Sequence, residues 1–503
     1  MRLKDILYQK KDSPDTAIEY NSCYITYAEL FNKVEEIAKL IKSTKQNYNT
    51  IGVYLNNSIN YIVAYFAIAF ADKIIVPMSV KSHESELLSM IDYCDLDLVI
   101  TDSLYREDLL CILQRCTYKI TVFNLDDKSL EEQFRPCRDF LSKESFQRDR
   151  RSDKAEENND VALILHTSGT TSRPRRVMLT DNNLISNIRS ISKVLDINKK
   201  SRTLLALPMH LSSGNSQMLT HLYVGAAVII MDMPFFPGNV LSLIQNRKVT
   251  NFFGVPFHME ALIRLKNVEK YDLGTLRFMC FGGGPVYEEG IIAFHKMFSR
   301  IGFIQMYGQT EASPRITHLL ADDCLKKLGS VGLPIPGVKL RIIDCDGRDV
   351  DPDEVGELIV SGENIMKGYY KCPEETSEVL RDGWLYTGDL ASRDRDGYVY
   401  IAGRSKNIII YSGYNIYPEE VEEVLLSHPD VSEAYVYGMA DEFSGQVPVA
   451  KVVLEYSRNA SPDELIKFCF EKLESYKIPN RIIITEHIDR TLSGKIKRAL
   501  PAH

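Results

Sequence analysis

The sequence predicts a large α/β domain followed by a small α+β domain. The chain has 503 residues, 45% of them hydrophobic, so it is long enough to build large cores in more than one domain. Short apolar runs alternate with helical patterns over most of its length, which is typical of an α/β sheet. After residue 403 the order becomes helix, strand, strand, helix and strand, which indicates a second unit of about one hundred residues.

The first well-marked helix is predicted to begin at Thr26. Thr26 and Glu29 form a capping box, and apolar side chains then recur at helical spacing from Leu30 to Ile41. The elements that follow are predicted as a strand at residues 51–55, a helix at 61–70, and strands at 74–77, 98–101 and 118–123.

A polar segment separates these elements from a second group. Residues 147–160 have almost no apolar side chains, so we predict a solvated connection there. An apolar strand at 161–166 then leads into the loop Thr167–Arg176, whose small, hydroxylated and basic residues suit phosphate oxygens. Such loops are more often plain turns, and the G-x-x-x-x-G-K-[ST] pattern is absent. The loop alone therefore does not predict a nucleotide site.

The C-terminal unit has clear boundaries between its elements. Proline begins a helix at Pro418 and another at Pro462, a residue that favours the first helical turn. The apolar runs at 431–438, 447–456 and 481–485 are predicted as strands.

Composition excludes several classes of function. The chain has 68 acidic and 60 basic side chains, a formal charge of −8, which does not favour nucleic acid or an anionic membrane surface. Its 10 cysteines lack C-x-x-C pairs, which argues against zinc sites and a disulfide framework. The first residues contain no apolar segment of signal-peptide length, and no uncharged apolar run reaches the roughly 18 residues of a spanning helix. We therefore predict a cytoplasmic protein without a membrane span.

Six segments, taken in order, resemble the adenylate-forming superfamily of acyl-CoA synthetases, luciferases and nonribosomal peptide adenylation domains. They are residues 166–180 (HTSGTTSRPRRVMLT), 306–311 (MYGQTE), 356–369 (GELIVSGENIMKGY), 386–390 (YTGDL), 403–418 (GRSKNIIIYSGYNIYP) and 493–498 (SGKIKR). The resemblance covers essentially the whole chain. It implies stacked sheets with helices and a small β-barrel part in residues 1–402, and a small mobile domain in residues 403–503.

The resemblance also implies a reaction. A carboxylate attacks the α-phosphorus of ATP, pyrophosphate leaves, and the acyl group passes from the adenylate to a thiol. It implies ATP as substrate with Mg²⁺, and catalytic roles for Lys495, Glu311 and Thr167. The nucleotide-binding residues that it implies are Thr167, Ser168, Gly169, Thr170, Thr171, Arg175, Gly283, Gly284, Pro285, Met306, Tyr307, Gly308, Gln309, Thr310, Asp389, Arg404 and Lys495.

Individual roles follow from the same resemblance. Glu311 would help to hold Mg²⁺, a hard cation that prefers carboxylate and phosphate oxygens. Asp389 would accept hydrogen bonds from both ribose hydroxyls, with Arg404 contacting the ribose. Tyr307 would stack on adenine, and the glycine-rich segment 282–285 would run along the adenine and the acyl pocket.

The small domain would carry a catalytic lysine, which changes its position between the two half-reactions. Lys495 would lie between the α-phosphate and the carboxylate during adenylation, where a cation stabilises the transition state most. Lys406 would be the hinge between the domains. After rotation, Gly413 and Tyr414 would line the tunnel for the thiol.

Four positions depart from the family pattern. Ser172 and Arg176 stand where glycine is usual, and Arg175 stands where lysine is usual but keeps a cation for phosphate. Ile410 occupies a position where many relatives have a second lysine, which bears on thioester formation and leaves adenylation unaffected.

The acyl pocket would be built from residues 207–217, 253–258 and 282–284. The residues assigned to it are His210, Ser212, Ser213, Val255, Gly282 and Gly284. In the amino-acid-activating members of the superfamily, the resemblance implies an aspartate in the first of these segments that pairs with the α-ammonium group. Here no aspartate occurs between Thr203 and Met231, and a buried ammonium group without a counter-charge is costly. We therefore expect a carboxylic acid without an α-amino group, and the serines favour a short or oxygen-bearing acid.

The thiol acceptor is left open between two molecules. Because only five residues follow Arg498, we expect the acceptor to be separate: coenzyme A or a free-standing acyl or peptidyl carrier protein. A carrier-loading ligase of secondary metabolism is thus one alternative to an acyl-CoA synthetase. A non-catalytic nucleotide-binding relative is another, favoured by the altered loop and Ile410 but opposed by retention of Glu311, Asp389, Arg404 and Lys495.

Overall fold

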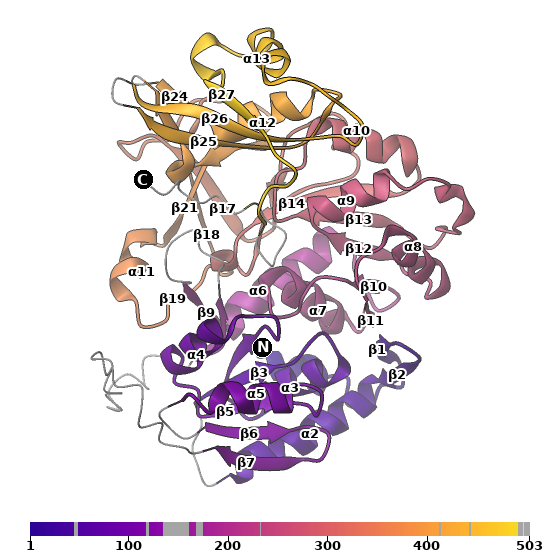
Figure 1. Cartoon of the computed structure of the whole chain (residues 1–503). Coiled ribbons are helices and arrows are strands. Elements are labelled where there is room, and N and C mark those ends of the chain that lie inside the picture. The colour runs from indigo at the N-terminus through magenta and orange to yellow at the C-terminus, as the bar shows by residue number, and fades with distance from the viewer. Residues whose placement is uncertain are drawn as a thin grey trace.

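The strands of the computed structural model form four sheets within the described residues (Figure 1). It describes residues 1–44, 49–116, 120–133, 160–166, 175–231, 233–411, 414–441, 444–490 and 496. The first sheet lies at the bottom of Figure 1, and the sheet of the C-terminal unit lies at the top.

The first sheet has eight strands in the order β19-β9-β8-β4-β3-β5-β6-β7. Its central strands are parallel, whereas β9 and β7 pair antiparallel to their neighbours. The strands are β3 (Thr50–Tyr54), β4 (Ile74–Met78), β5 (Leu98–Thr101), β6 (Ile120–Asn124), β7 (Ser129–Gln133), β8 (Val161–His166), β9 (Arg176–Thr180) and β19 (Gly368–Tyr369). The strands predicted in this part of the chain are confirmed within the described residues. Of the predicted solvated connection, residues 147–160, the structure describes only Asp160.

The second sheet has nine strands in the order β16-β15-β14-β13-β12-β10-β11-β1-β2. Strands β11, β10, β12, β13 and β14 run parallel, so their carboxyl ends meet at one edge. The strands are β1 (Thr16–Tyr20), β2 (Cys23–Thr26), β10 (Arg202–Leu205), β11 (Ala227–Ile230), β12 (Asn251–Gly254), β13 (Phe278–Gly282), β14 (Gly302–Gly308), β15 (Arg315–Leu319) and β16 (Leu333–Pro334).

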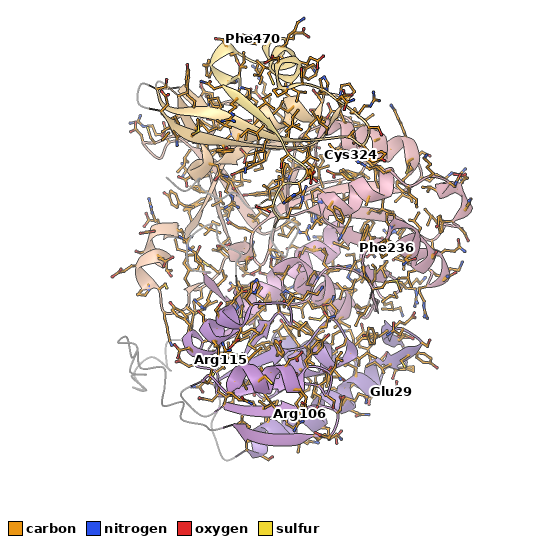
Figure 2. The ribbon with its side chains drawn as sticks, viewed as in Figure 1. Glu29, Arg106, Arg115, Phe236, Cys324 and Phe470 are labelled. Atoms are coloured by element: carbon orange, nitrogen blue, oxygen red, sulfur yellow. The ribbon has the colours of Figure 1, made fainter. Side chains whose placement is uncertain are left out.

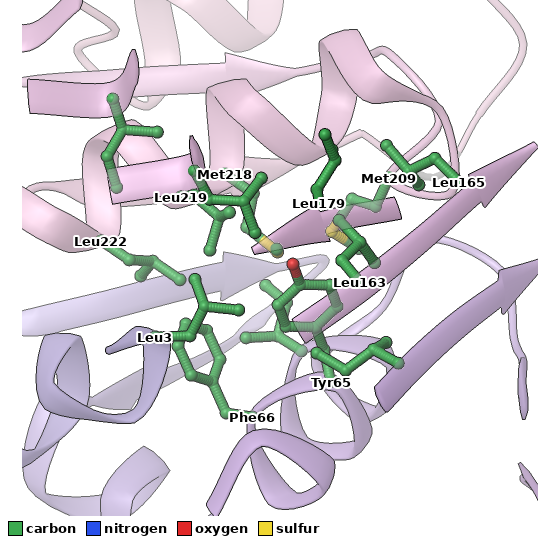
Figure 3. Close-up of a cluster of buried hydrophobic side chains, with 14 of the residues drawn as sticks. Leu3, Tyr65, Phe66, Leu163, Leu165, Leu179, Met209, Met218, Leu219 and Leu222 are labelled. Carbon is green, nitrogen blue, oxygen red and sulfur yellow. The ribbon is translucent and has the colours of Figure 1, made fainter. Parts of the chain in front are cut away.

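One core joins the two sheets. Apolar side chains of α1, α2, α3, α6 and α7 pack between them, and Figure 3 shows Tyr65 of α3 near Leu163 of β8 and Met218 of α7, with Phe66 of α3 beside Leu3 of α1. The predicted capping box of α2 is confirmed, since Thr26 accepts from the Glu29 backbone. These helices are α1 (Leu3–Tyr8), α2 (Tyr27–Ser43), α3 (Ile59–Phe70), α6 (Asp181–Val194) and α7 (Ser212–Val224).

Other helices cover the outer faces of the two sheets. Helices α4 and α5 pack on the first sheet, and α8, α9 and α10 pack on the second. Their bounds are α4 (Glu84–Tyr93), α5 (Arg106–Leu113), α8 (Pro237–Asn246), α9 (Pro256–Ile263) and α10 (Glu288–Met297).

The third sheet corrects one prediction. Its antiparallel strands pair in the order β17-β18-β21-β20, with β22 also on β21. A barrel closes only when its outer strands pair, and β17 does not pair with β22. The part predicted as a small β-barrel is therefore an open sheet among the described strands. The elements are β17 (Val338–Ile343), β18 (Gly356–Gly362), β20 (Leu380–Arg381), β21 (Trp384–Arg393), β22 (Val399–Arg404) and helix α11 (Pro373–Val379).

The C-terminal unit has its own sheet, core and pair of helices. The sheet order is β24-β23-β26-β25, with β27 on β26, and α12 and α13 contribute to a separate apolar cluster. Phe470, which ends α13, is exposed at the tip farthest from the first sheet (Figure 2). The elements are β23 (Ile409–Tyr411), β24 (Tyr414–Ile416), α12 (Pro418–Leu426), β25 (Val431–Asp441), β26 (Gly445–Leu454), α13 (Pro462–Phe470) and β27 (Arg481–Ile484).

The predicted α+β character of this unit is confirmed. Strand β22 crosses the predicted boundary between residues 402 and 403, and the exact boundary stays a prediction.

Candidate active site

Several predicted site segments meet at the carboxyl edge of the second sheet. Val255 follows β12, Gly282 ends β13, and Gly308 ends β14, and these three strands are parallel neighbours. A side chain at Gly282 would come within 2.5 Å of the Met306 carbonyl oxygen, so only glycine fits there. A Cβ at Gly283 would lie 3.8 Å from Val255. The fold thus brings the predicted adenine and acyl segments together.

The first cluster of polar side chains at this edge surrounds a buried carboxylate. Asp389, in β21, is 3% exposed, and its two oxygens accept from Tyr307 and Arg404 at 2.5 and 2.6 Å. Asp389 lies directly opposite Arg404 in the β21–β22 pair. Burial raises the pKa of Tyr307 well above its ordinary value, and the Asp389 carboxylate raises it further. Three residues predicted to bind the adenosine part of ATP are therefore in direct contact.

A second cluster surrounds Glu311. The Tyr369 hydroxyl donates to the Glu311 carboxylate at 2.9 Å and accepts from Arg175 at 3.3 Å. Arg175 also donates to Glu375 at 2.9 Å, and its guanidinium lies 5.0 Å from the centre of the Tyr369 ring. The predicted magnesium ligand and the predicted phosphate-binding cation are thus joined through one tyrosine.

The donor set at Glu311 fits a magnesium ion carried in by a nucleotide. Among the described residues, no group of three or more His, Cys, Asp or Glu side chains is arranged so that it could hold a metal ion by itself. Mg²⁺ in nucleotide sites is commonly held by one or two carboxylates together with substrate phosphates. Glu311 would supply a carboxylate, and phosphate oxygens and water would complete the shell.

The predicted acyl segment touches the predicted nucleotide segment. The Thr310 hydroxyl donates to the Ser212 hydroxyl at 3.2 Å, and Ser213 follows in the first turn of α7. Burial lowers the pKa of His210 to about 4, with Lys81 adding to the effect, so His210 is neutral at pH 7. This arrangement offers hydroxyl and neutral imidazole groups beside the phosphate end of the site.

Comparison with known protein families decides the classification. Residues 8–370 match the family described as AMP-binding enzyme, and residues 420–495 match the AMP-binding enzyme C-terminal domain. The chain belongs to the AMP-binding enzyme family. The predicted membership of the adenylate-forming superfamily is thereby confirmed.

Curated relatives of this AMP-binding enzyme match along almost their full length. A feruloyl-CoA synthase from Amycolatopsis sp is 31% identical over 482 residues, which cover 96% of this chain and 94% of that protein. A 2-succinylbenzoate–CoA ligase from Bacillus mycoides is 31% identical, with 97% and 95% covered. The predicted enzyme class, an acid–thiol ligase, is therefore confirmed.

Solved structures agree with this classification. The o-succinylbenzoate coenzyme A synthetase of Bacillus subtilis, in complex with ATP and magnesium ion, has a TM-score of 0.84 with 28% identity. The match covers 98% of each chain. The predicted use of ATP and Mg²⁺ is in line with the contents of that structure.

Two of the residues that depart from the family pattern, Arg176 and Ile410, lie in strands of this AMP-binding enzyme. Arg176 begins β9 with an ordinary strand conformation, is buried, and lies 4.0 Å from the centre of the Tyr93 ring, with a bond to the Ser89 hydroxyl. It is therefore a core residue behind the predicted phosphate loop. Ile410 lies in β23 and is 55% exposed.

Some predicted residues lie outside the described part of the enzyme. They are Thr167, Ser168, Gly169, Thr170, Thr171, Gly413 and Lys495, together with the side chains of Lys406 and Tyr414. Their roles stay predictions.

Tyr369 and Glu375 were missed by the sequence analysis. Tyr369 ends one of the six family-like segments, so its position was a signal, but nothing in the sequence shows that it contacts Glu311. Glu375 lies 200 residues from its partner Arg175 and gave no signal at all.

Within the part of the chain that the structure describes, no helix combines the length and the apolar character needed to cross a membrane.

Proposed function

We propose that this AMP-binding enzyme activates a carboxylic acid without an α-amino group as its acyl-adenylate, using ATP with Mg²⁺, and transfers the acyl group to coenzyme A. The observation that supports this most strongly is the cluster of Asp389, Tyr307 and Arg404 beside that of Glu311, Tyr369 and Arg175. One cluster suits a ribose and the other suits phosphates with a divalent cation.

The first cluster would fix the adenosine. Asp389 accepts from Tyr307 and Arg404, and because a carboxylate oxygen has two lone pairs, an oxygen that accepts from one of them can also accept from a ribose hydroxyl. The bonds from Tyr307 and Arg404 hold the buried carboxylate in one orientation before ATP binds.

The second cluster would neutralise the triphosphate. Glu311 would hold Mg²⁺ while Arg175 exchanges part of its pairing with Glu375 for phosphate oxygens. Glu375 is 45% exposed, so breaking this pair costs only about 1 kcal/mol. Bringing a carboxylate to the α-phosphorus requires this neutralisation, because both reactants are anions.

Residues 403–503 would act as the mobile domain, with Lys406 as hinge and Lys495 as the cation at the reacting atoms. Two of the contacts between this domain and the rest of the chain are weak. Arg264 and Glu455 pair at 2.8 Å, but both are substantially exposed. Burial raises the pKa of Glu423 of α12, and Glu288, Glu289 and Glu420 raise it further, so like charges oppose one another where α10 meets α12. Such an interface favours movement.

Coenzyme A is the acceptor that the relatives support, because they are named CoA ligases and synthases. The three names also describe acids that contain an aromatic ring, which supports including aromatic acids among the candidates. A carrier protein as acceptor and the cytoplasmic location stay predictions from the sequence.

Adenylation is tested by ATP–pyrophosphate exchange with Mg²⁺ across pools of short-chain, aromatic, hydroxy, amino and long-chain acids. We expect exchange with one or more of the pools of acids that lack an α-amino group, and none with the amino acids. Exchange confined to the amino acids would contradict the substrate class. No exchange in any pool, from folded enzyme that still binds ATP, would favour the non-catalytic alternative.

A further inference from the structure

Arg315 is a buried cation that the proposed reaction does not use. It begins β15, lies opposite Gly308 at the end of β14, and is 4% exposed. Its Nη1 atom is completely buried without a hydrogen-bond partner, and among the described residues no carboxylate pairs with its guanidinium. Burying a cation without a counter-charge is costly. A buried arginine that has no acidic partner in the protein therefore indicates that a bound ligand supplies the negative charge.

The Arg315 side chain lies on the same face of the second sheet as the predicted acyl segments. The pairing of β14 with β15 shifts its register between Tyr307 and Gly308, so that Arg315 and the next residue, Ile316, both lie beside Gly308. The guanidinium is close enough to the Cys280 thiol and the His318 ring to change the pKa of each. Cys280 packs with Leu207, Phe253 and Met306, which belong to or adjoin the segments predicted to form the acyl pocket.

Arg315 is not placed to bind the carboxylate that reacts. The Arg315 backbone lies at the carboxyl edge, opposite Gly308, but its guanidinium acts on Cys280, which precedes Gly282 by two residues and so lies about 7 Å inside that edge. A group bound by Arg315 would therefore be at the end of the acid remote from ATP.

The backbone of Arg315 is held firmly. The Asn187 side chain of α6 accepts from the Arg315 backbone N–H at 3.3 Å and donates to its carbonyl at 2.8 Å, and Asn364 donates to the same carbonyl at 3.3 Å. These bonds fix the backbone from which the side chain extends before any ligand binds. His318 lies beside it with neither ring nitrogen hydrogen-bonded, and burial lowers its pKa well below the ordinary value. A neutral imidazole can donate one further hydrogen bond to the same ligand.

We propose that Arg315 binds a second carboxylate at the far end of the acyl substrate, so that the acid activated by this enzyme is a dicarboxylic acid. The planar guanidinium suits a carboxylate, which it can contact through two parallel N–H groups. This inference rests on the proposed function and names the class of its substrate.

The test compares acids that differ only in the second carboxylate. The pairs are hexanoate with adipate, phenylacetate with 2-carboxyphenylacetate, and 3-benzoylpropionate with 2-succinylbenzoate. In ATP–pyrophosphate exchange we expect the wild type to favour the dicarboxylate in at least one pair by about 100-fold in kcat/KM. Arg315→Met should reduce that ratio to about threefold or less, and Arg315→Lys should retain part of it. Arg341→Met, which removes an arginine that is paired with Asp349 in the third sheet, should leave the ratio unchanged.

A preference for the monocarboxylate in every pair, or an unchanged ratio in Arg315→Met, would overturn the inference. Melting temperatures, measured with each acid and without ATP, separate this inference from the proposed function. Stabilisation of the wild type by a dicarboxylate, lost in Arg315→Met, supports the role of Arg315 even if no acid supports exchange. Absence of both exchange and stabilisation counts against both proposals.

A structural role would give a different result. Because no described group pairs with the guanidinium, Arg315→Met should melt no lower than the wild type in the absence of ligand. If Arg315→Met unfolds while Arg315→Lys folds without any preference for dicarboxylates, the positive charge of Arg315 stabilises the folded protein and does not bind the substrate. The inference would then be wrong.

Discussion

Replacing Asp389 by alanine is expected to weaken ATP binding by roughly 30- to 1,000-fold, because truncating one member of a buried, hydrogen-bonded charged cluster costs about 2–4 kcal/mol. The change removes the carboxylate that would accept from the ribose, and it leaves Tyr307 and Arg404 without their shared partner. The dissociation constant for ATP, measured by titration calorimetry, gives the size of the effect.

Two further variants make this result interpretable. Asp389→Asn keeps the shape of the side chain and should weaken ATP binding less than alanine does, while preserving the fold. Asp349→Ala removes an exposed carboxylate that lies between β17 and β18 and should leave ATP binding unchanged. Wild-type affinity in a folded Asp389→Ala variant would remove Asp389 from the nucleotide site.

Lys495→Ala is expected to slow adenylation by roughly 100- to 1,000-fold, the usual effect of removing one group that stabilises charge in a transition state. Transfer of the acyl group to coenzyme A from a supplied acyl-adenylate should proceed at close to the wild-type rate, since the lysine would have moved away by then. Exchange of pyrophosphate and formation of the thioester measure the two half-reactions separately.

The neighbouring lysine provides the control. Lys497 lies two residues further along the same basic segment, and Lys497→Ala should affect neither half-reaction strongly. Equal loss of adenylation and transfer in Lys495→Ala would contradict the assignment of the lysine to one conformation of a rotating domain.

Local patterns in the sequence predicted most of the secondary structure. The capping box at Thr26 and the prolines at Pro418 and Pro462 act within one helical turn, so they can be read without knowing the fold. The predicted barrel failed for the opposite reason. Whether β17 pairs with β22 depends on strands that are about 60 residues apart, and a resemblance of motifs does not specify that pairing.

The candidate site was predictable only in part. Asp389, Tyr307 and Arg404 were found because each lies in a family-like segment, and the structure adds that they contact one another. Tyr369 also lies in such a segment, but nothing there indicates its contact with Glu311, and Glu375 and Arg315 lie outside all six segments. Their significance comes from contacts or missing partners across distant parts of the chain, such as Arg175 with Glu375.

The central claim is that the carboxylate itself attacks ATP. The most direct test supplies an acid labelled with ¹⁸O in its carboxylate, together with ATP, Mg²⁺ and coenzyme A, and measures the label in AMP by mass spectrometry. Attack on the α-phosphorus makes a carboxylate oxygen bridge the acyl and phosphoryl groups, and that oxygen leaves with AMP when the thiol takes the acyl group. We predict one labelled oxygen in each AMP formed. Label that appears in pyrophosphate or phosphate, with none in AMP, would contradict the acyl-adenylate mechanism.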